Sequence, residues 1–180
     1  MIEESVTSIP GQSFIDVGNK TIHLIGEVNE HMYATVQEGI GRLADSEGDY
    51  CFTLNSYGGN LTDGLAIYEL ITHFCGNTKI IVLGSCMSAA FVILQAGTER
   101  VASPMAEFML HYGSEEADNG EAKKHNKRLF NKMRDCMLSK SKVSKTLMTK
   151  WCNSTKYMDS QEALEKGFVD RIMGDDNGQG

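Results

Sequence analysis

The chain has 180 residues, 41% of them hydrophobic, and a formal net charge of −7. This size and composition predict one globular domain, spanning residues 1–180, with a substantial buried core. The acidic balance argues against nucleic acid as a partner, because phosphate binding needs a basic surface. No apolar run approaches the roughly 18 residues of a membrane span, so no membrane partner is expected.

The amino-terminal segment, residues 1–20, precedes the first core strand and lacks the basic and apolar regions of a signal peptide. Within it, Phe14, Ile15 and Val17 can pack as a short strand. The five scattered cysteines suit reduced thiols, so a cytoplasmic location is expected. The polar tail, residues 174–180, is expected to be disordered.

Hydrophobic periodicity predicts strands and helices that alternate along the chain. Strands are expected near 21–26, 50–54, 79–83, 99–102, 106–111 and 168–172. Helices are expected near 29–44, 61–75, 87–97, 121–140, 143–152 and 160–166. This order predicts an α/β fold with a mainly parallel sheet and crossover helices.

A glycine pair, Gly58 and Gly59, follows the strand at 50–54. Two glycines allow positive φ angles and a close approach of the main chain to a ligand. A free N–H there can donate to an oxyanion. The alternative is an ordinary turn before the helix at 61–75, with Asn60 or Thr62 as its cap.

A lone hydroxyl, that of Ser88, lies where the strand at 79–83 gives way to an apolar helix. Serine nucleophiles occur at such corners, where the helix N-terminus stabilises negative charge. The alternative is that Ser85 or Ser88 only caps the helix. Cys86 is a second candidate nucleophile, although its position favours a small buried side chain.

A histidine, His111, ends the short strand that follows. It can act as a general base if a nucleophile lies opposite, and is otherwise an ordinary solvated side chain. The five histidines show no pairing with cysteine at zinc spacing, and no nucleotide-binding fingerprint is present. We therefore expect neither a metal nor a cofactor.

The helix at 121–140 is amphipathic. Its basic side chains surround an apolar stripe formed by Leu129, Phe130, Met133 and Met137. The stripe can pack on the protein's own core or serve assembly. Acidic residues at 115, 116, 118 and 121 lie beside the basic face and argue against nucleic acid.

Four segments of the chain resemble motifs of the ClpP (caseinolytic) serine peptidase family. Residues 55–59 look like its N-S-P-G-G motif, and 84–90 are similar to G-x-A-A-S-M-G-A around the nucleophile. Residues 108–111 look like a strand ending in M-I-H, and 160–170 resemble S-A-x-E-A-x-E-Y-G-L-V-D. The four occur in family order and at near-matching spacing, from about residue 21 to 173.

The resemblance implies a serine peptidase in which Ser88 is the nucleophile, His111 the general base, and the N–H groups of Gly59 and Ala89 the oxyanion hole. It implies the ClpP/crotonase superhelix of ββα units, with the helix at 121–140 as a protruding handle. It further implies heptameric rings stacked as a tetradecamer, unfolded-protein or peptide substrates, and a Clp-type ATPase or another ClpP as partner.

The chain departs from the family at the third catalytic residue. Counting back without a gap from the segment at 160–170 places Thr155 where the family has aspartate. Asn153 lies two residues before this position and Asp159 four after it. Without a carboxylate to balance the imidazolium, a weak or silent site is expected.

Two further functions share this fold. One is a non-catalytic ring subunit that modifies a mixed ClpP complex, which the missing aspartate favours. The other is a crotonase-type acyl-CoA enzyme, against which the pairing of Ser88 with His111 at family spacing counts.

Overall fold

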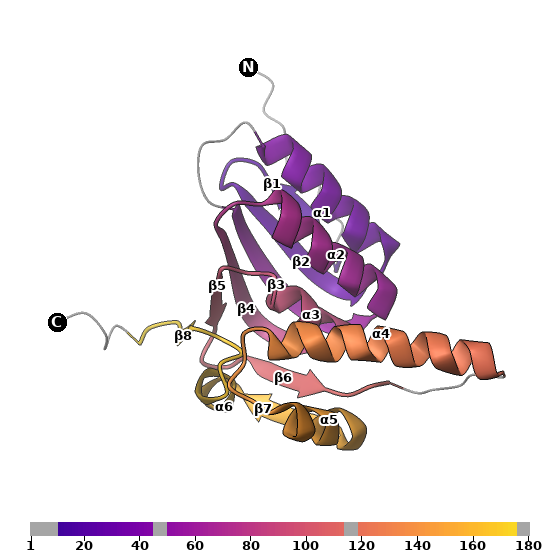
Figure 1. Ribbon diagram of the computed structural model, residues 1–180. Coiled ribbons are helices and arrows are strands. Elements are labelled where there is room, and N and C mark those ends of the chain that lie inside the picture. Colours follow the sequence, from indigo (N-terminus) through magenta and orange to yellow (C-terminus); the bar gives the residue numbers. More distant parts are fainter. Residues whose placement is uncertain (1–10, 45–49, 114–118, 176–180) are drawn as a thin grey trace.

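The computed structural model describes residues 11–44, 50–113 and 119–175. These residues form a mixed α/β fold around one sheet (Figure 1). Its strands are β1 (Phe14–Asp16), β2 (Thr21–Val28), β3 (Tyr50–Gly59), β4 (Thr78–Met87), β5 (Glu99–Ala102), β6 (Glu107–Leu110), β7 (Lys156–Asp159) and β8 (Arg171–Ile172). The order is β1-β2-β3-β4-β5-β8, and β6 pairs with both β4 and β7.

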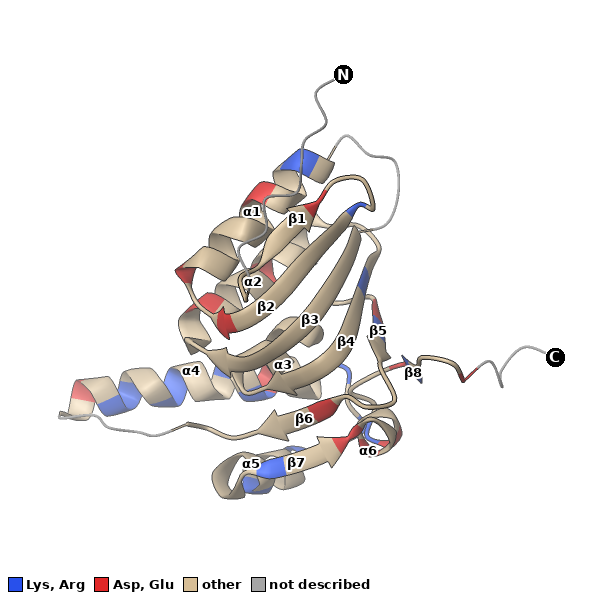
Figure 2. Ribbon diagram, turned by 180° about the vertical axis from the view of Figure 1, so that it is seen from behind, with Lys and Arg blue, Asp and Glu red and all other residues tan. Residues whose placement is uncertain are grey.

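The central strand pairs are parallel, as the alternation of strands and helices predicts. Only β1–β2 and β6–β7 are antiparallel among the described pairs. The helices α1 (Glu30–Leu43), α2 (Leu61–Phe74) and α3 (Ala89–Leu94) lie on one face of the sheet. Figure 2 shows the other face of β2, β3 and β4, which no described helix covers.

The core lies between one face of the sheet and the helices α1, α2 and α3. Every residue of the six-residue helix α3 is buried, which explains why it has no polar side. Phe91 of α3 lies at the centre, with its ring centroid 5.3 Å from that of Phe108 and 5.0 Å from that of Phe168. The helix that begins at Ser88 is thus held by aromatic packing from β6 and the carboxyl-terminal region.

The strand β4 changes partner along its length. Residues Lys79 to Val82 pair with β5, whereas Ser85 to Met87 pair with β6. An irregularity between Leu54 and Ser56 in the register with β3 accompanies the change. As a result, the end of β4, which leads into Ser88, lies beside the end of β6, which leads into His111.

Three helices complete the described chain: α4 (Gly120–Leu138), α5 (Lys145–Ser154) and α6 (Ser160–Glu165). The amino-terminal part of α4 extends beyond the sheet (Figure 1), and lysine and arginine residues gather along it (Figure 2). This is the protruding helix that the family resemblance implies. No helix among the described residues is long and apolar enough to cross a membrane.

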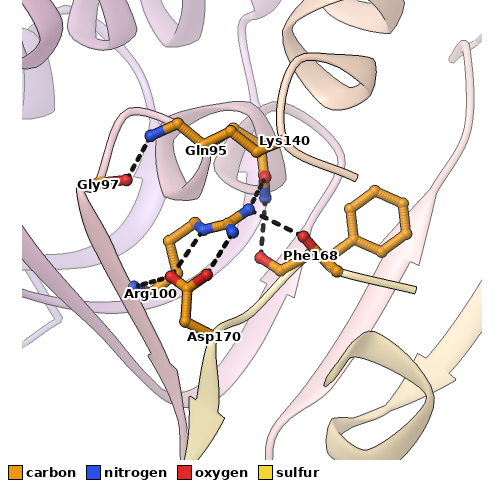
Figure 3. Close-up of polar contacts among 7 residues, drawn as sticks. Gln95, Gly97, Arg100, Lys140, Phe168 and Asp170 are labelled. Atoms are coloured by element: carbon orange, nitrogen blue, oxygen red, sulfur yellow. Dashed lines mark hydrogen bonds and ion pairs between the residues drawn. The ribbon is translucent and has the colours of Figure 1, made fainter. Parts of the chain in front are cut away.

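A polar network anchors the carboxyl-terminal region to β5 (Figure 3). The buried Arg100 guanidinium donates to both carboxylate oxygens of Asp170, at 3.0 and 2.6 Å, and to the Gln95 side chain at 2.8 Å. Lys140, just after α4, donates from Nζ to the Gly97 carbonyl at 2.6 Å. These contacts fix the segment that follows α6 and the end of α4 against the same corner of the core.

Several element boundaries differ from the sequence expectations. The strands β3 and β4 continue to Gly59 and Met87, and α3 ends at Leu94 rather than residue 97. The strand β7 was not predicted, and the strand expected at 168–172 is reduced to Arg171–Ile172. The expected short strand near residue 14 is present as β1. The tail at 174–180 was expected to be disordered, and its residues from 176 onward lie outside the described part of the chain.

Candidate active site

Ser88 occupies a sharp turn between β4 and α3. Its backbone has φ 52° and ψ −123°, a conformation that residues other than glycine rarely adopt. It stands at the N-cap position of α3, yet its hydroxyl makes no capping hydrogen bond. The Ser88 Oγ instead lies 2.9 Å from Nε2 of His111. The capping alternative therefore does not describe this side chain.

His111 reaches Ser88 because β4 and β6 run parallel. Met87 pairs with Met109, and the Ser88 N–H donates to the Met109 carbonyl at 2.9 Å. Partial burial lowers the pKa of the His111 imidazole from 6.5. At neutral pH the ring is therefore mostly uncharged, so Nε2 can accept the hydroxyl proton when Nδ1 carries the ring hydrogen.

The glycine pair lies directly against this turn. Gly58 and Gly59 have φ angles of 95° and 152°. A Cβ atom at Gly58 would lie 2.7 Å from the Ser88 Cβ and 3.1 Å from the Ala89 nitrogen. Only a residue without a side chain fits so close to Ser88.

The polar residues around the glycine pair have structural roles. Asn55 accepts a hydrogen bond from the Ser85 N–H at 2.9 Å, and the Ser56 hydroxyl accepts one from the Gly58 N–H at 3.1 Å. The alternative interpretation of the glycine pair, a turn that leads into a capped helix, also holds. Asn60 caps α2, because its side chain accepts hydrogen bonds from the N–H groups of two residues in the first turn of that helix. The turn is thus both a helix entry and a wall of the site.

Two backbone donors lie near Ser88. Ala89 is the first residue of α3, so its N–H has no partner within the helix. Gly59 lines the same pocket as Ser88 and His111, whereas Ala89 is buried and is not among the residues that line it. The Ser88 N–H is already used by Met109 and is therefore unavailable to a substrate.

The pocket that contains Ser88 has a volume of about 300 Å³. One wall is α4, which contributes Leu129, Phe130 and Met133. Phe130 also packs on Tyr112, the residue after the histidine, with ring centroids 5.1 Å apart. From the sequence, this apolar stripe was expected either to pack on the protein's own core or to serve assembly, and its place in the candidate site was not foreseen. Its buried members are Met133 and Met137, whereas Leu129 and Phe130 remain partly exposed.

A second pocket, also about 300 Å³, lies on another side of His111. Thr155 and Asn153 line it, together with Tyr112, Gly113 and Cys152. The β6–β7 ladder pairs Leu110 with Lys156, so the next residues, His111 and Thr155, come opposite one another. We refer to this space as the Thr155 pocket.

No carboxylate lines either pocket within the described chain. Asp159 pairs with Glu107 at the far end of the β6–β7 ladder, four positions from Thr155. Its carboxylate accepts a hydrogen bond from the Glu162 N–H at 2.7 Å and so caps α6. Asp159 is therefore not a neighbour of the imidazole.

Cys86 is fully buried, and burial raises the pKa of its thiol well above 9.0. A neutral buried thiol is a poor nucleophile, which agrees with its expected role as a small core residue. Among the described residues, no cluster of three or more His, Cys, Asp or Glu side chains could hold a metal ion.

Comparisons with known proteins agree on one family. The model of the Clp protease family matches residues 14–176. The chain is 28% identical over 166 residues to the ATP-dependent Clp protease proteolytic subunit of Streptococcus pneumoniae strain Hungary19A-6, covering 86% of this chain and 85% of that protein. The same figures hold for the subunit of strain CGSP14.

A solved structure shares the fold. An asparagine-to-aspartate mutant of ClpP1 from Listeria monocytogenes superposes with a TM-score of 0.80 at 22% sequence identity. The match covers 89% of this chain and 95% of that one.

Proposed function

This chain belongs to the Clp protease family, and we propose that it is a serine peptidase subunit in which Ser88 is the nucleophile and His111 the general base. The observation that carries the proposal is the 2.9 Å contact between the Ser88 Oγ and the His111 Nε2 inside a pocket. The positive φ of Ser88 adds support, because strain of this kind concentrates at functional sites.

In the proposed reaction, the Ser88 Oγ attacks the carbonyl carbon of a peptide bond and its proton passes to the His111 Nε2. The C–N bond of the tetrahedral intermediate then breaks, and His111 gives the proton to the leaving amine. Water attacks the acyl-enzyme by the same route, again with His111 as the base, and regenerates Ser88.

The N–H groups of Gly59 and Ala89 are proposed to hold the oxyanion. The proposal is supported by the position of Gly59 in the Ser88 pocket and by the free first-turn N–H of Ala89. Two backbone donors fixed before the reaction stabilise developing charge without reorganisation.

The substrate is proposed to be a peptide or unfolded protein with an apolar side chain next to the cleaved bond. Leu129, Phe130 and Met133 form an apolar wall across from Gly59 and Ser88. Burial of an apolar side chain against this wall would contribute about 2 kcal/mol to binding.

No carboxylate lines either pocket among the described residues, so low turnover is part of the proposal. Thr155, opposite His111, can donate or accept a hydrogen bond but supplies no charge to balance the imidazolium. Asn153 in the same pocket is also neutral. Loss of the acid in a serine protease lowers turnover by roughly 10⁴-fold.

Assembly is proposed to follow the family: heptameric rings, stacked in pairs through α4. The amino-terminal part of α4 projects beyond the sheet, where a second copy can pack against it (Figure 1). Leu129 and Phe130, farther along the same helix, are partly exposed. The relatives are named as proteolytic subunits of an ATP-dependent protease. We therefore propose a Clp-type ATPase or another ClpP as a partner in the cytoplasm.

A second candidate function is a non-catalytic ring subunit that modifies a mixed ClpP complex. Among the described residues neither pocket is lined by a carboxylate, which favours this candidate. The crotonase-type alternative is not favoured, because the matching family and relatives are Clp proteases. An assay of fluorogenic-peptide hydrolysis by the purified protein, with Ser88→Ala as the control, decides between the serine peptidase and the non-catalytic subunit. Cleavage that depends on Ser88 supports the peptidase, and none under any condition supports the non-catalytic subunit.

A further inference from the structure

The Thr155 pocket is a polar space beside the candidate base, His111. His111 lines it, and so do the neutral side chains of Thr155, Asn153 and Tyr112. Its volume of about 300 Å³ is ample for a few non-hydrogen atoms and water. It shares His111, Tyr112 and Gly113 with the Ser88 pocket, but neither Ser88 nor the apolar wall of α4 lines it.

The two ring nitrogens of His111 have different surroundings. Nε2 contacts the Ser88 hydroxyl, whereas no described residue forms a hydrogen bond with Nδ1. The nitrogens of an imidazole point in nearly opposite directions, so Nδ1 faces away from Ser88. The pocket without Ser88 is therefore the one that Nδ1 can reach. When Nε2 accepts from Ser88, Nδ1 carries a hydrogen and needs an acceptor.

We propose that the Thr155 pocket binds a small carboxylate from solution, of the formate and acetate class, which accepts the hydrogen bond of His111 Nδ1 and raises peptidase turnover. This inference rests on the proposed function of Ser88 and His111. The carboxylate takes no covalent part: it fixes the tautomer of the ring and balances the charge that appears when the proton of Ser88 moves to Nε2.

The contacts available to such a ligand agree with its chemistry. The Thr155 hydroxyl and the Asn153 amide can each donate a hydrogen bond to a carboxylate oxygen. No described acidic side chain in the pocket repels it. The carboxyl end of α5, with its partial negative charge, lies at Asn153 and opposes an anion. Binding should therefore be weak while His111 is neutral and tighten as the imidazolium forms.

The test compares peptidase activity of the wild type in sodium formate, sodium nitrate and sodium chloride at one ionic strength. Nitrate is planar and of similar size but is a much weaker hydrogen-bond acceptor. We expect formate to raise kcat/KM about tenfold or more over both other salts, a partial recovery of what the acid contributes. Acetate should act similarly if the space admits a methyl group.

Variants locate the effect. Thr155→Asp supplies a built-in carboxylate, so it should be active in chloride and gain nothing from formate. Thr155→Gly enlarges the pocket at a backbone with φ 56°, which glycine adopts freely, and should respond to formate at least as strongly as the wild type. Ser88→Ala should be inactive in every salt.

The outcomes separate this inference from the proposed function. An active Thr155→Asp with a wild type that formate does not raise would overturn the carboxylate site and leave the peptidase intact. Equal stimulation by nitrate would show a general effect of salt and would also overturn the carboxylate site. If no variant is active, the proposed function fails. NMR titration of His111 then tests whether the Thr155 pocket binds formate, because bound formate should raise the pKa of the imidazole. An unchanged titration would exclude binding.

Discussion

His111 and Thr155 lie opposite one another at the end of the β6–β7 ladder, and both line one pocket. The backbone of Thr155 has φ 56° and ψ 119°, a conformation that is unfavourable for a β-branched residue. A carboxylate at position 155 would line the same pocket as the imidazole, and none of the described residues supplies one there. The described part of the site thus has a candidate nucleophile and a candidate base but no acid.

The first prediction concerns the contact between Gly58 and the nucleophile. Gly58→Ala would place a methyl group 2.7 Å from both the Ser88 Cβ and the Met87 carbonyl oxygen, at a φ of 95°. Ser88 must shift, so activity measured in the Thr155→Asp background should fall about a hundredfold, with a loss of about 1–3 kcal/mol in unfolding free energy.

Gly41→Ala is the matched control for that substitution. Gly41 lies in α1, and a Cβ atom there meets nothing within 4 Å. Because alanine favours a helix over glycine, this variant should gain up to about 1 kcal/mol and keep its activity. A Gly58→Ala protein as active and stable as Gly41→Ala would show that the close approach is not needed.

The second prediction concerns the acid stability that Asp170 provides. Burial raises the pKa of its carboxyl, but the hydrogen bonds and charge of Arg100 outweigh this and lower the pKa below 3.8. The folded-state pKa is depressed, so this stabilisation is fully present above the unfolded value of about 4 and is lost as pH falls through the folded value.

Asp170→Asn should therefore unfold more easily at neutral pH and depend less on pH between about 5 and 3. Arg100 is only 6% exposed and would lose its charged partner, while Asp170 is 41% exposed, so we expect a cost of about 2 kcal/mol rather than that of a fully buried pair. Urea unfolding at pH 7 and pH 3.5 checks this. An equal pH dependence for both proteins would contradict it.

The pH dependence of peptide cleavage is the third prediction. A general base must be uncharged, so kcat/KM should rise with pH and level off above the pKa of His111. Partial burial lowers that pKa from 6.5, so the wild-type midpoint should lie below it. In Thr155→Asp the opposite charge should move the midpoint upward. A midpoint that is the same in both proteins would mean that residue 155 does not act on the imidazole.

The fourth prediction concerns assembly through α4. Lys124 and Arg128 are exposed on this helix, so Lys124→Glu with Arg128→Glu should separate stacked rings while leaving the subunit folded. Lys150→Glu on α5 is the control and should leave the rings paired. Light scattering measures the mass in each case. A wild-type particle that stays at the 19.8 kDa of one chain at micromolar concentration would contradict ring assembly.

Much of the fold follows from local pattern. The strand at 79–83 and the amphipathic helices were predictable because their hydrophobic pattern is strong, although Leu83 of this strand is exposed. The strand β7 was not, since its four residues pair only with β6 and lie between two helices. The longer ends of β3 and β4 also depend on partners distant in sequence, Val28 and Met109.

The site was predictable in part for the same reason. Ser88 and His111 stand in recognisable local sequences, and the fold brings them to 2.9 Å. The apolar wall from α4 and the Thr155 pocket could not be read from the sequence. They arise where side chains of α4 and the end of α5 lie beside residues 111–113, which follow β6. A helical apolar stripe has the same sequence pattern whether it lines a site or a core.

The most direct test of the central claim is one peptidase assay of the wild type, Thr155→Asp and Ser88→Ala under identical conditions. We expect very low turnover for the wild type and turnover about a hundredfold or more higher for Thr155→Asp. Ser88→Ala should show no turnover at all. Robust wild-type cleavage that Thr155→Asp abolishes, or cleavage that survives Ser88→Ala, would contradict the central claim.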